Sequence, residues 1–132
     1  MDKQKERRLL QLAVALACLV PLCAGTAGVV QGISMIESAG AVPDLESHFR
    51  YLSGLLLGLG IGFAVSVPTI ERRSELFMVL SFTVVVGGLA RLCALMVFGM
   101  PGTPYVLAFG MELVVVPLLF VWQRRVALAF RS

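Results

Sequence analysis

From Leu9 to Ile36 the sequence contains no charged residue, a run of 28 positions rich in leucine, valine and alanine. A helix that crosses the hydrocarbon core of a bilayer needs about 20 apolar residues, so this run predicts a membrane span over residues 9–30. The alternative is a cleaved signal peptide, because a basic segment precedes the run and the small residues CAGTAG lie within it. The apolar part of a signal peptide is only about 7–15 residues long, so we favour a retained helix.

Three further apolar runs follow. Residues 51–70 carry no charge, residues 76–98 are interrupted by Arg91 alone, and residues 105–122 are interrupted by Glu112 alone. These runs predict spans over residues 50–68, 76–98 and 104–123. The stretch GMPGTP between the last two is rich in helix-breaking residues and predicts a tight turn. The sequence therefore predicts an all-α fold, a four-helix transmembrane bundle with up-down topology, formed as one integral membrane domain over residues 1–132.

Composition and charge agree with this class of protein. Hydrophobic residues make up 58% of the chain and charged residues 14%, whereas a soluble domain carries roughly a quarter of its residues as charge. Nine of the eleven lysines and arginines fall at one end of the predicted helices, namely Lys3, Lys5, Arg7, Arg8, Arg72, Arg73, Arg124, Arg125 and Arg131. The positive-inside rule makes that end cytoplasmic, so both termini are expected in the cytoplasm. This distribution accounts for the net charge of +3 without a nucleic-acid partner.

At the other end of the predicted helices, the loop between the spans 9–30 and 50–68 is expected to carry the acidic residues Glu37, Asp44 and Glu46.

The residues that most often carry chemistry are sparse. Cys18, Cys23 and Cys93 lie in apolar runs without the spacing of a metal or disulfide motif, so they are expected to pack as small hydrophobic residues. His48 is the one histidine, which excludes a multi-histidine metal site within a single chain. We predict no metal, no cofactor and no catalytic residue, and an enzymatic role through the cysteines or His48 is the least favoured interpretation.

Arg91 and Glu112 are the two charges inside predicted spans. They lie at equal offsets on either side of the turn GMPGTP, so an antiparallel hairpin places them at one depth, about 12 Å inside the outer boundary at ~1.5 Å per residue. A lone charge near the bilayer centre costs at least ~2.5–3.5 kcal/mol, which predicts that Arg91 and Glu112 form a pair. The small residues Gly87, Gly88 and Ala94 beside Arg91 predict a packed helix interface there.

The second predicted span contains a stripe of glycines. Gly54, Gly58 and Gly62 repeat every four residues and form two overlapping GxxxG patterns, which allow another helix to approach closely. We favour packing within the chain over a dimer seam. Arg50 precedes Gly54 by four positions and begins the same stripe, and His48 lies near the same outer end.

Two functional interpretations stay open. The first, which we favour, is a non-enzymatic structural or accessory role, in which the Arg91–Glu112 pair fixes helix register and Arg50 binds phosphate head groups. The alternative is a polar pocket open to the outer side, formed by Arg50, Arg91, Glu112 and His48, that binds or transports a small anionic or polar ligand such as a lipid head group. The lipid bilayer is the expected partner in both. A homo-oligomer or another membrane-protein partner is also open.

Two segments, PDLESHFRYLSGLLLGLGIG and GGLARLCALMVFGMPGTPYVLAFGMELVVVPLLFVW, carry a resemblance to a known family. The shared pattern is a His/Asn-x-Arg-x-x-x-Gly start to the second helix, a late arginine in the third, a Gly-Pro-type turn and a glutamate in the fourth. The matching positions are His48, Arg50, Gly54, Arg91, Pro101 or Pro104, and Glu112.

In this pattern the chain resembles the small four-helix bacterial membrane proteins catalogued as domain of unknown function 4345. The resemblance implies the bacterial inner (cytoplasmic) membrane and the four-helix fold, and it implies no activity. Members of that family often carry an acidic residue before the glycine of the turn, and the stretch FGMPGTP lacks it here.

Overall fold

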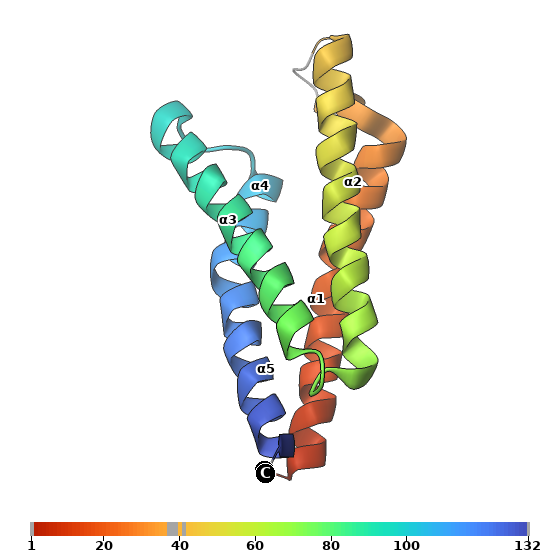
Figure 1. Ribbon diagram of the computed structural model, residues 1–132. Helices are drawn as coiled ribbons and strands as arrows, with labels where there is room; N and C mark the ends of the chain where they lie inside the picture. The colour runs from red at the N-terminus through yellow and green to blue at the C-terminus, as the bar shows by residue number, and fades with distance from the viewer. Residues whose placement is uncertain (1, 37–39, 41, 132) are drawn as a thin grey trace. The chain divides into compact units, whose positions relative to one another are not determined.

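The computed structural model describes residues 2–36, 40 and 42–131, and Glu37 lies outside them (Figure 1). Every regular element in that part of the chain is helical. The α-helices are α1 (Lys3–Gln31), α2 (Pro43–Ser66), α3 (Ser74–Phe98), α4 (Thr103–Gly110) and α5 (Val116–Arg131). Short helical turns connect them: the 3-10 turns η1 (Gly32–Met35) and η2 (Val67–Thr69), and the π turn η3 (Met111–Val115).

Four helical stretches are long and apolar enough to cross a membrane: Lys3–Met35, Pro43–Thr69, Ser74–Phe98 and Thr103–Arg131. The all-helical prediction with four candidate spans is therefore confirmed. The up-down order and the cytoplasmic termini stay predictions.

The helices extend past the predicted spans at their polar ends. Helix α1 begins at Lys3 and has 29 residues, which gives a length of about 43 Å against a hydrocarbon thickness of about 30 Å. Helix α5 continues to Arg131, beyond the predicted end at residue 123. The apolar runs mark only the segment inside the lipid, and the glutamine, lysine, arginine and glutamate residues beyond it are good helix formers that prolong the helix into the interface.

The residues group into two compact units, which are described separately. One consists of Val14–Val65, and the other of the chain up to Ala13 together with the chain from Ser66 onward. The single domain over residues 1–132 stays a prediction.

In the unit Val14–Val65, glycines bring α1 and α2 together. A Cβ atom added at Gly25 would lie 2.6 Å from the backbone nitrogen of Leu57, and one added at Gly60 would lie 3.0 Å from the backbone nitrogen of Leu22. A Cβ at Gly28 would overlap the hydroxyl of Ser53. Such close backbone approach is typical of helix pairs in membranes. The hydrophobic effect does not drive helices together in lipid, and small residues at the interface permit the van der Waals packing that does.

The end of α1 is capped by side chains from α2. Gly32 adopts a left-handed conformation with φ +64°, which ends α1 and which a glycine accepts without a Cβ clash. The Ile33 N–H then donates to Glu46 Oε2 at 2.7 Å, and Arg50 donates to the Val29 carbonyl oxygen. Glu46 and Arg50 also form an ion pair with each other. These bonds satisfy backbone groups that a helix end leaves without partners.

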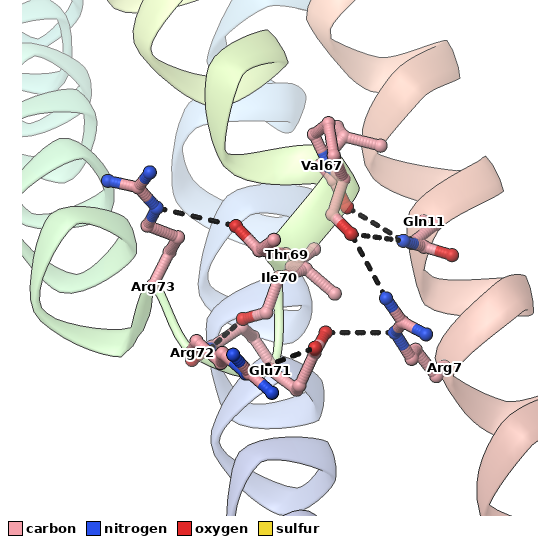
Figure 2. A network of polar contacts seen from close by, with 10 residues as sticks. Arg7, Gln11, Val67, Thr69, Ile70, Glu71, Arg72 and Arg73 are labelled. Atoms are coloured by element: carbon pink, nitrogen blue, oxygen red, sulfur yellow. Dashed lines mark hydrogen bonds and ion pairs between the residues drawn. The ribbon is translucent and has the colours of Figure 1, made fainter.

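In the other unit, polar side chains of α1 hold the connection between α2 and α3 (Figure 2). Arg7 pairs with Glu71 at 2.8 Å and donates to the Pro68 carbonyl oxygen at 3.0 Å. Gln11 donates to the carbonyl oxygens of Val67 and Pro68 at 2.9 and 3.2 Å. Carbonyl groups in a turn lack helical partners, and these donors supply them.

Helix α5 contributes to the same region through Gln123. Its side chain is fully buried and donates to the Ile70 carbonyl oxygen at 2.8 Å and to Ser74 Oγ at 3.0 Å. Arg125 of α5 also pairs with Glu6 of α1 at 3.2 Å. The start of α1, the α2–α3 connection and α5 are thus joined by side-chain contacts.

Helices α3 and α5 run antiparallel. Ser74 at the start of α3 meets Gln123 in the middle of α5, whereas Gly88, farther along α3, packs against Leu113 ahead of α5. The turn between α3 and α4 begins at Gly99, whose φ of +89° favours glycine. The Gly99 N–H donates to the Leu95 carbonyl oxygen at the end of α3.

The fourth span contains a wide turn. The π turn Met111–Val115 lies directly before Pro117, which has no N–H to give to the carbonyl of Leu113 and whose ring would clash with that carbonyl in a regular α-helix. A π turn widens the helix and relieves this conflict. The irregularity of the fourth span therefore lies in the turn before Pro117.

Candidate functional site

The predicted contact between Arg91 of α3 and Glu112 of η3 is present in the structure. Arg91 Nε donates to Glu112 Oε1 at 3.0 Å and lies 2.9 Å from Oε2, which has no hydrogen-bond partner among the described residues. The side chain of Glu112 is 16% exposed and that of Arg91 39% exposed. The carboxylate is therefore the more enclosed partner, and the arginine reaches toward the surface.

Gly88 permits this contact, because it lies one turn before Arg91 and faces the same hairpin partner. A Cβ added at Gly88 would lie 2.7 Å from Leu113 Cδ2 and 3.0 Å from Glu112 Cβ. A Cβ added at Gly87 would meet nothing within 4 Å. Of the two adjacent glycines, Gly88 is thus the one that lets α3 approach the π turn closely.

Most of the guanidinium of Arg91 stays available. Among the described residues its ion pair and hydrogen bond use Nε alone, which leaves the four N–H bonds of Nη1 and Nη2 free for another acceptor. The Arg91 Cζ atom lies 5.9 Å from the ring centroid of Tyr105, within the range of a cation–π contact. Tyr105 therefore supports the cation from the side of α4.

A cavity of about 490 Å³ lies beside Arg91, between the end of α3 and the start of α4. Arg91 is the one charged residue that the described part of the chain contributes to it. The other lining residues are apolar, aromatic or part of the turn: Ala94, Leu95, Phe98, Gly99, Met100, Pro101, Tyr105, Val106 and Phe109. A concave, mostly apolar site with one converging polar group has the general character of a small-molecule pocket.

The structure describes the other predicted polar residues in the unit Val14–Val65. Arg50 pairs with Glu46 and donates to the carbonyl oxygen of Val29, so its guanidinium is engaged at the end of α1. His48 is exposed on α2. Arg50 therefore has a local structural role, which the sequence pattern did not indicate.

Gly54 and Gly58 of the predicted glycine stripe on α2 do not face α1. A Cβ added at Gly54 or Gly58 meets nothing within 4 Å. The close α1–α2 contact uses Gly25, Gly28 and Gly60 instead. The two sets differ because residues 53, 57 and 60 share the face toward α1, and the stripe is rotated away from it. A packing partner for Gly54, Gly58 and Gly62 stays a prediction.

Several residues around Arg91 were not identified from the sequence as parts of a site. In the sequence, Tyr105 is typical of an interfacial aromatic residue, Phe98 and Phe109 are ordinary residues of predicted spans, and Met100 belongs to the predicted turn. Their assembly depends on the turn, which brings the ends of two helices together. The sequence offered one indication of these neighbours, which is the length of the Arg91 side chain. Long arginine side chains in a membrane span can extend toward the polar end of their helix, where these residues lie.

The described residues contain no group of three or more histidine, cysteine, aspartate or glutamate side chains that could hold a metal ion. The three cysteines are free thiols, with Cys18 buried and Cys23 and Cys93 exposed.

A family model described as "Domain of unknown function (DUF4345)" matches residues 9–123, and the chain belongs to this family. No curated protein and no solved structure matches the chain.

Proposed function

We propose that this member of the DUF4345 family is a multi-pass protein of the bacterial cytoplasmic membrane that binds an acidic amphiphile in the pocket beside Arg91. Both termini lie in the cytoplasm in this proposal, because nine basic residues gather at that end. The pocket then opens near the outer face, where the α3–α4 turn lies.

The observation that supports the proposal is that free N–H donors of Arg91 lie beside the apolar walls of the cavity. Arg91 keeps both Nη groups available beside a cavity of about 490 Å³ whose other lining groups are mostly apolar. The fork of a guanidinium matches the oxygens of a carboxylate, phosphate or sulfonate group. The chain of an amphiphile would lie along side chains such as Phe98, Val106 and Phe109.

The ligand is best tested with a matched pair of probes. 1-Octanesulfonate is a simple anion with an apolar chain, and 1-octanol has the same chain without the charge. The full chain is placed in lipid nanodiscs, binding is measured by isothermal titration calorimetry, and partition into empty nanodiscs is subtracted. We expect saturable binding of octanesulfonate at one site per chain and weak binding of octanol.

The double variant Arg91→Gln/Glu112→Gln removes the cation without leaving a carboxylate alone. Loss of charge-assisted hydrogen bonds worth about 1.5–3 kcal/mol should weaken octanesulfonate binding roughly 10- to 150-fold. Arg124→Gln is the control, because Arg124 is exposed on α5, about 18 Å along the helix from Glu112. Equal binding of octanol and octanesulfonate, or equal loss in both variants, would refute the proposal.

A second candidate function is structural, as a non-enzymatic accessory protein whose Arg91–Glu112 pair fixes the register of the α3–α5 hairpin. It is favoured by the enclosure of Glu112 and by the tight contact at Gly88. In this case Arg91→Leu/Glu112→Leu leaves a folded protein with normal cellular behaviour, and neither probe saturates a site.

A further inference from the structure

The pocket beside Arg91 carries no surplus of positive charge. The single cation that lines it is already paired with Glu112 through Nε, with both carboxylate oxygens within 3.0 Å. An acidic ligand that docks on the Nη groups would therefore place two negative charges on one arginine.

Two anions on one cation are costly at this depth. The excess negative charge would lie beside the Glu112 carboxylate, which is 16% exposed and which the sequence predicts to lie about 12 Å inside the membrane boundary. An uncompensated charge in such a place costs several kcal/mol. Arginine is always charged in proteins and cannot adjust. A carboxylate can adjust, because it accepts a proton and becomes neutral.

Among the described residues of the hairpin formed by α3, α4 and α5, no other acidic side chain lies near Glu112. In this half of the hairpin α3 contributes Arg91 and the exposed Cys93, and α4 contributes Tyr105. Helix α5 has no titratable or charged side chain before Arg124. Among the described residues of this hairpin, the glutamate carboxylate is thus the group that can restore neutrality.

We infer that binding of an acidic ligand at the Arg91 pocket is coupled to uptake of one proton, which is held on the Glu112 carboxyl. The inference rests on the proposed function and specifies how the same site is regulated. Before binding, the arginine and the carboxylate cancel. After binding, the arginine and the ligand cancel, and the carboxylate has taken a proton from the solvent, so the net charge is unchanged.

Thermodynamic linkage gives this coupling two measurable signatures. The ligand strengthens proton binding and the proton strengthens ligand binding by the same factor. Affinity for an anion should therefore be highest at low pH and should fall by up to about tenfold per pH unit as the pH rises. Each binding event should also remove up to about one proton from the buffer.

The test uses the wild-type chain in lipid nanodiscs with 1-octanesulfonate, which remains a monoanion from about pH 5 to 9 and adds no titration of its own. Calorimetry at one pH in two buffers of different ionisation enthalpy counts the protons taken up, and repetition across that range gives the pH dependence. Glu112→Gln is the matched variant, because its amide resembles the protonated acid.

We expect proton uptake in the wild type, and no uptake and a flat pH profile in Glu112→Gln. Binding without proton uptake in the wild type would overturn the inference and leave the proposed function intact. Uptake that persists in Glu112→Gln would overturn the assignment to Glu112. Absence of saturable octanesulfonate binding at every pH would overturn the proposed function and the inference together. The wild-type proton count does not depend on the stability of any variant.

Discussion

Removal of one member of the Arg91–Glu112 pair should cost more than removal of both. The perturbation is a double-mutant cycle of Arg91→Leu, Glu112→Leu and the double variant, with stability measured for each. Each single variant leaves one charge without its partner, and the exposed fraction of that side chain indicates how easily the charge can reach solvent. Glu112 is 16% exposed and Arg91 is 39% exposed.

Arg91→Leu should be the more destabilising single change, because it leaves the more enclosed carboxylate alone. Removal of one partner of a buried pair costs about 3–5 kcal/mol, because it leaves the other charge uncompensated. We therefore expect a loss of about 3 kcal/mol at pH 7, and a smaller loss at lower pH, where a lone carboxylate takes up a proton more easily.

Glu112→Leu should cost about 1–2 kcal/mol, because the long side chain of Arg91 can extend toward the polar end of the helix. This loss should not change over the same pH range, because arginine stays charged. The double variant should lie within about 1 kcal/mol of the wild type, since an apolar replacement of a buried ion pair is often neutral. The cycle then gives a coupling energy of about 3–5 kcal/mol.

The assay is reversible unfolding in mixed detergent micelles as the fraction of dodecyl sulfate rises, followed by far-ultraviolet circular dichroism. The wild type and the three variants are compared at pH 7 and again near pH 5. If the two single losses simply add in the double variant, or if the cost of Arg91→Leu is the same at both pH values, the reasoning about the pair is wrong.

The same unfolding assay tests two further features of the packing. Gly25→Ala should lower stability by about 1–3 kcal/mol, because its Cβ would lie 2.6 Å from the backbone of Leu57. The control Gly58→Ala has open space around the new Cβ and should be neutral or gain up to about 1 kcal/mol in helix propensity. A loss of stability in Gly58→Ala would instead show that the glycine stripe packs against a partner. Gln123→Leu should lose about 1–3 kcal/mol, because it removes two hydrogen bonds from a fully buried donor, and an unchanged midpoint would show that these bonds do not hold the α2–α3 connection.

The sequence by itself determined the helices that can cross a membrane and the pairing of Arg91 with Glu112. Span positions follow from runs of apolar residues, because the bilayer imposes one length and excludes charge whatever the neighbouring helices are. The pairing follows from equal distances along two helices from one tight turn, which is a property of the local chain. Both predictions depend on short-range geometry and on the cost of a charge in lipid.

The tertiary structure decided which face of each helix is in contact and which side chains are engaged. Gly54 and Gly58 form the more regular pattern, but Gly25, Gly28 and Gly60 make the close contact, because small rotations of a helix exchange one stripe for the next.

Arg50 and Gln123 illustrate the same limit. Arg50 is engaged at the end of α1, and Gln123, which carries no distinctive sequence signal, is fully buried at the α2–α3 connection. The cavity beside Arg91 likewise depends on where the turn places the end of α3 and the start of α4. These features depend on how each helix is rotated about its axis and how far it lies from its neighbours. Lipid is equally compatible with any rotation of an apolar helix, so the pattern of apolar residues does not predict these features.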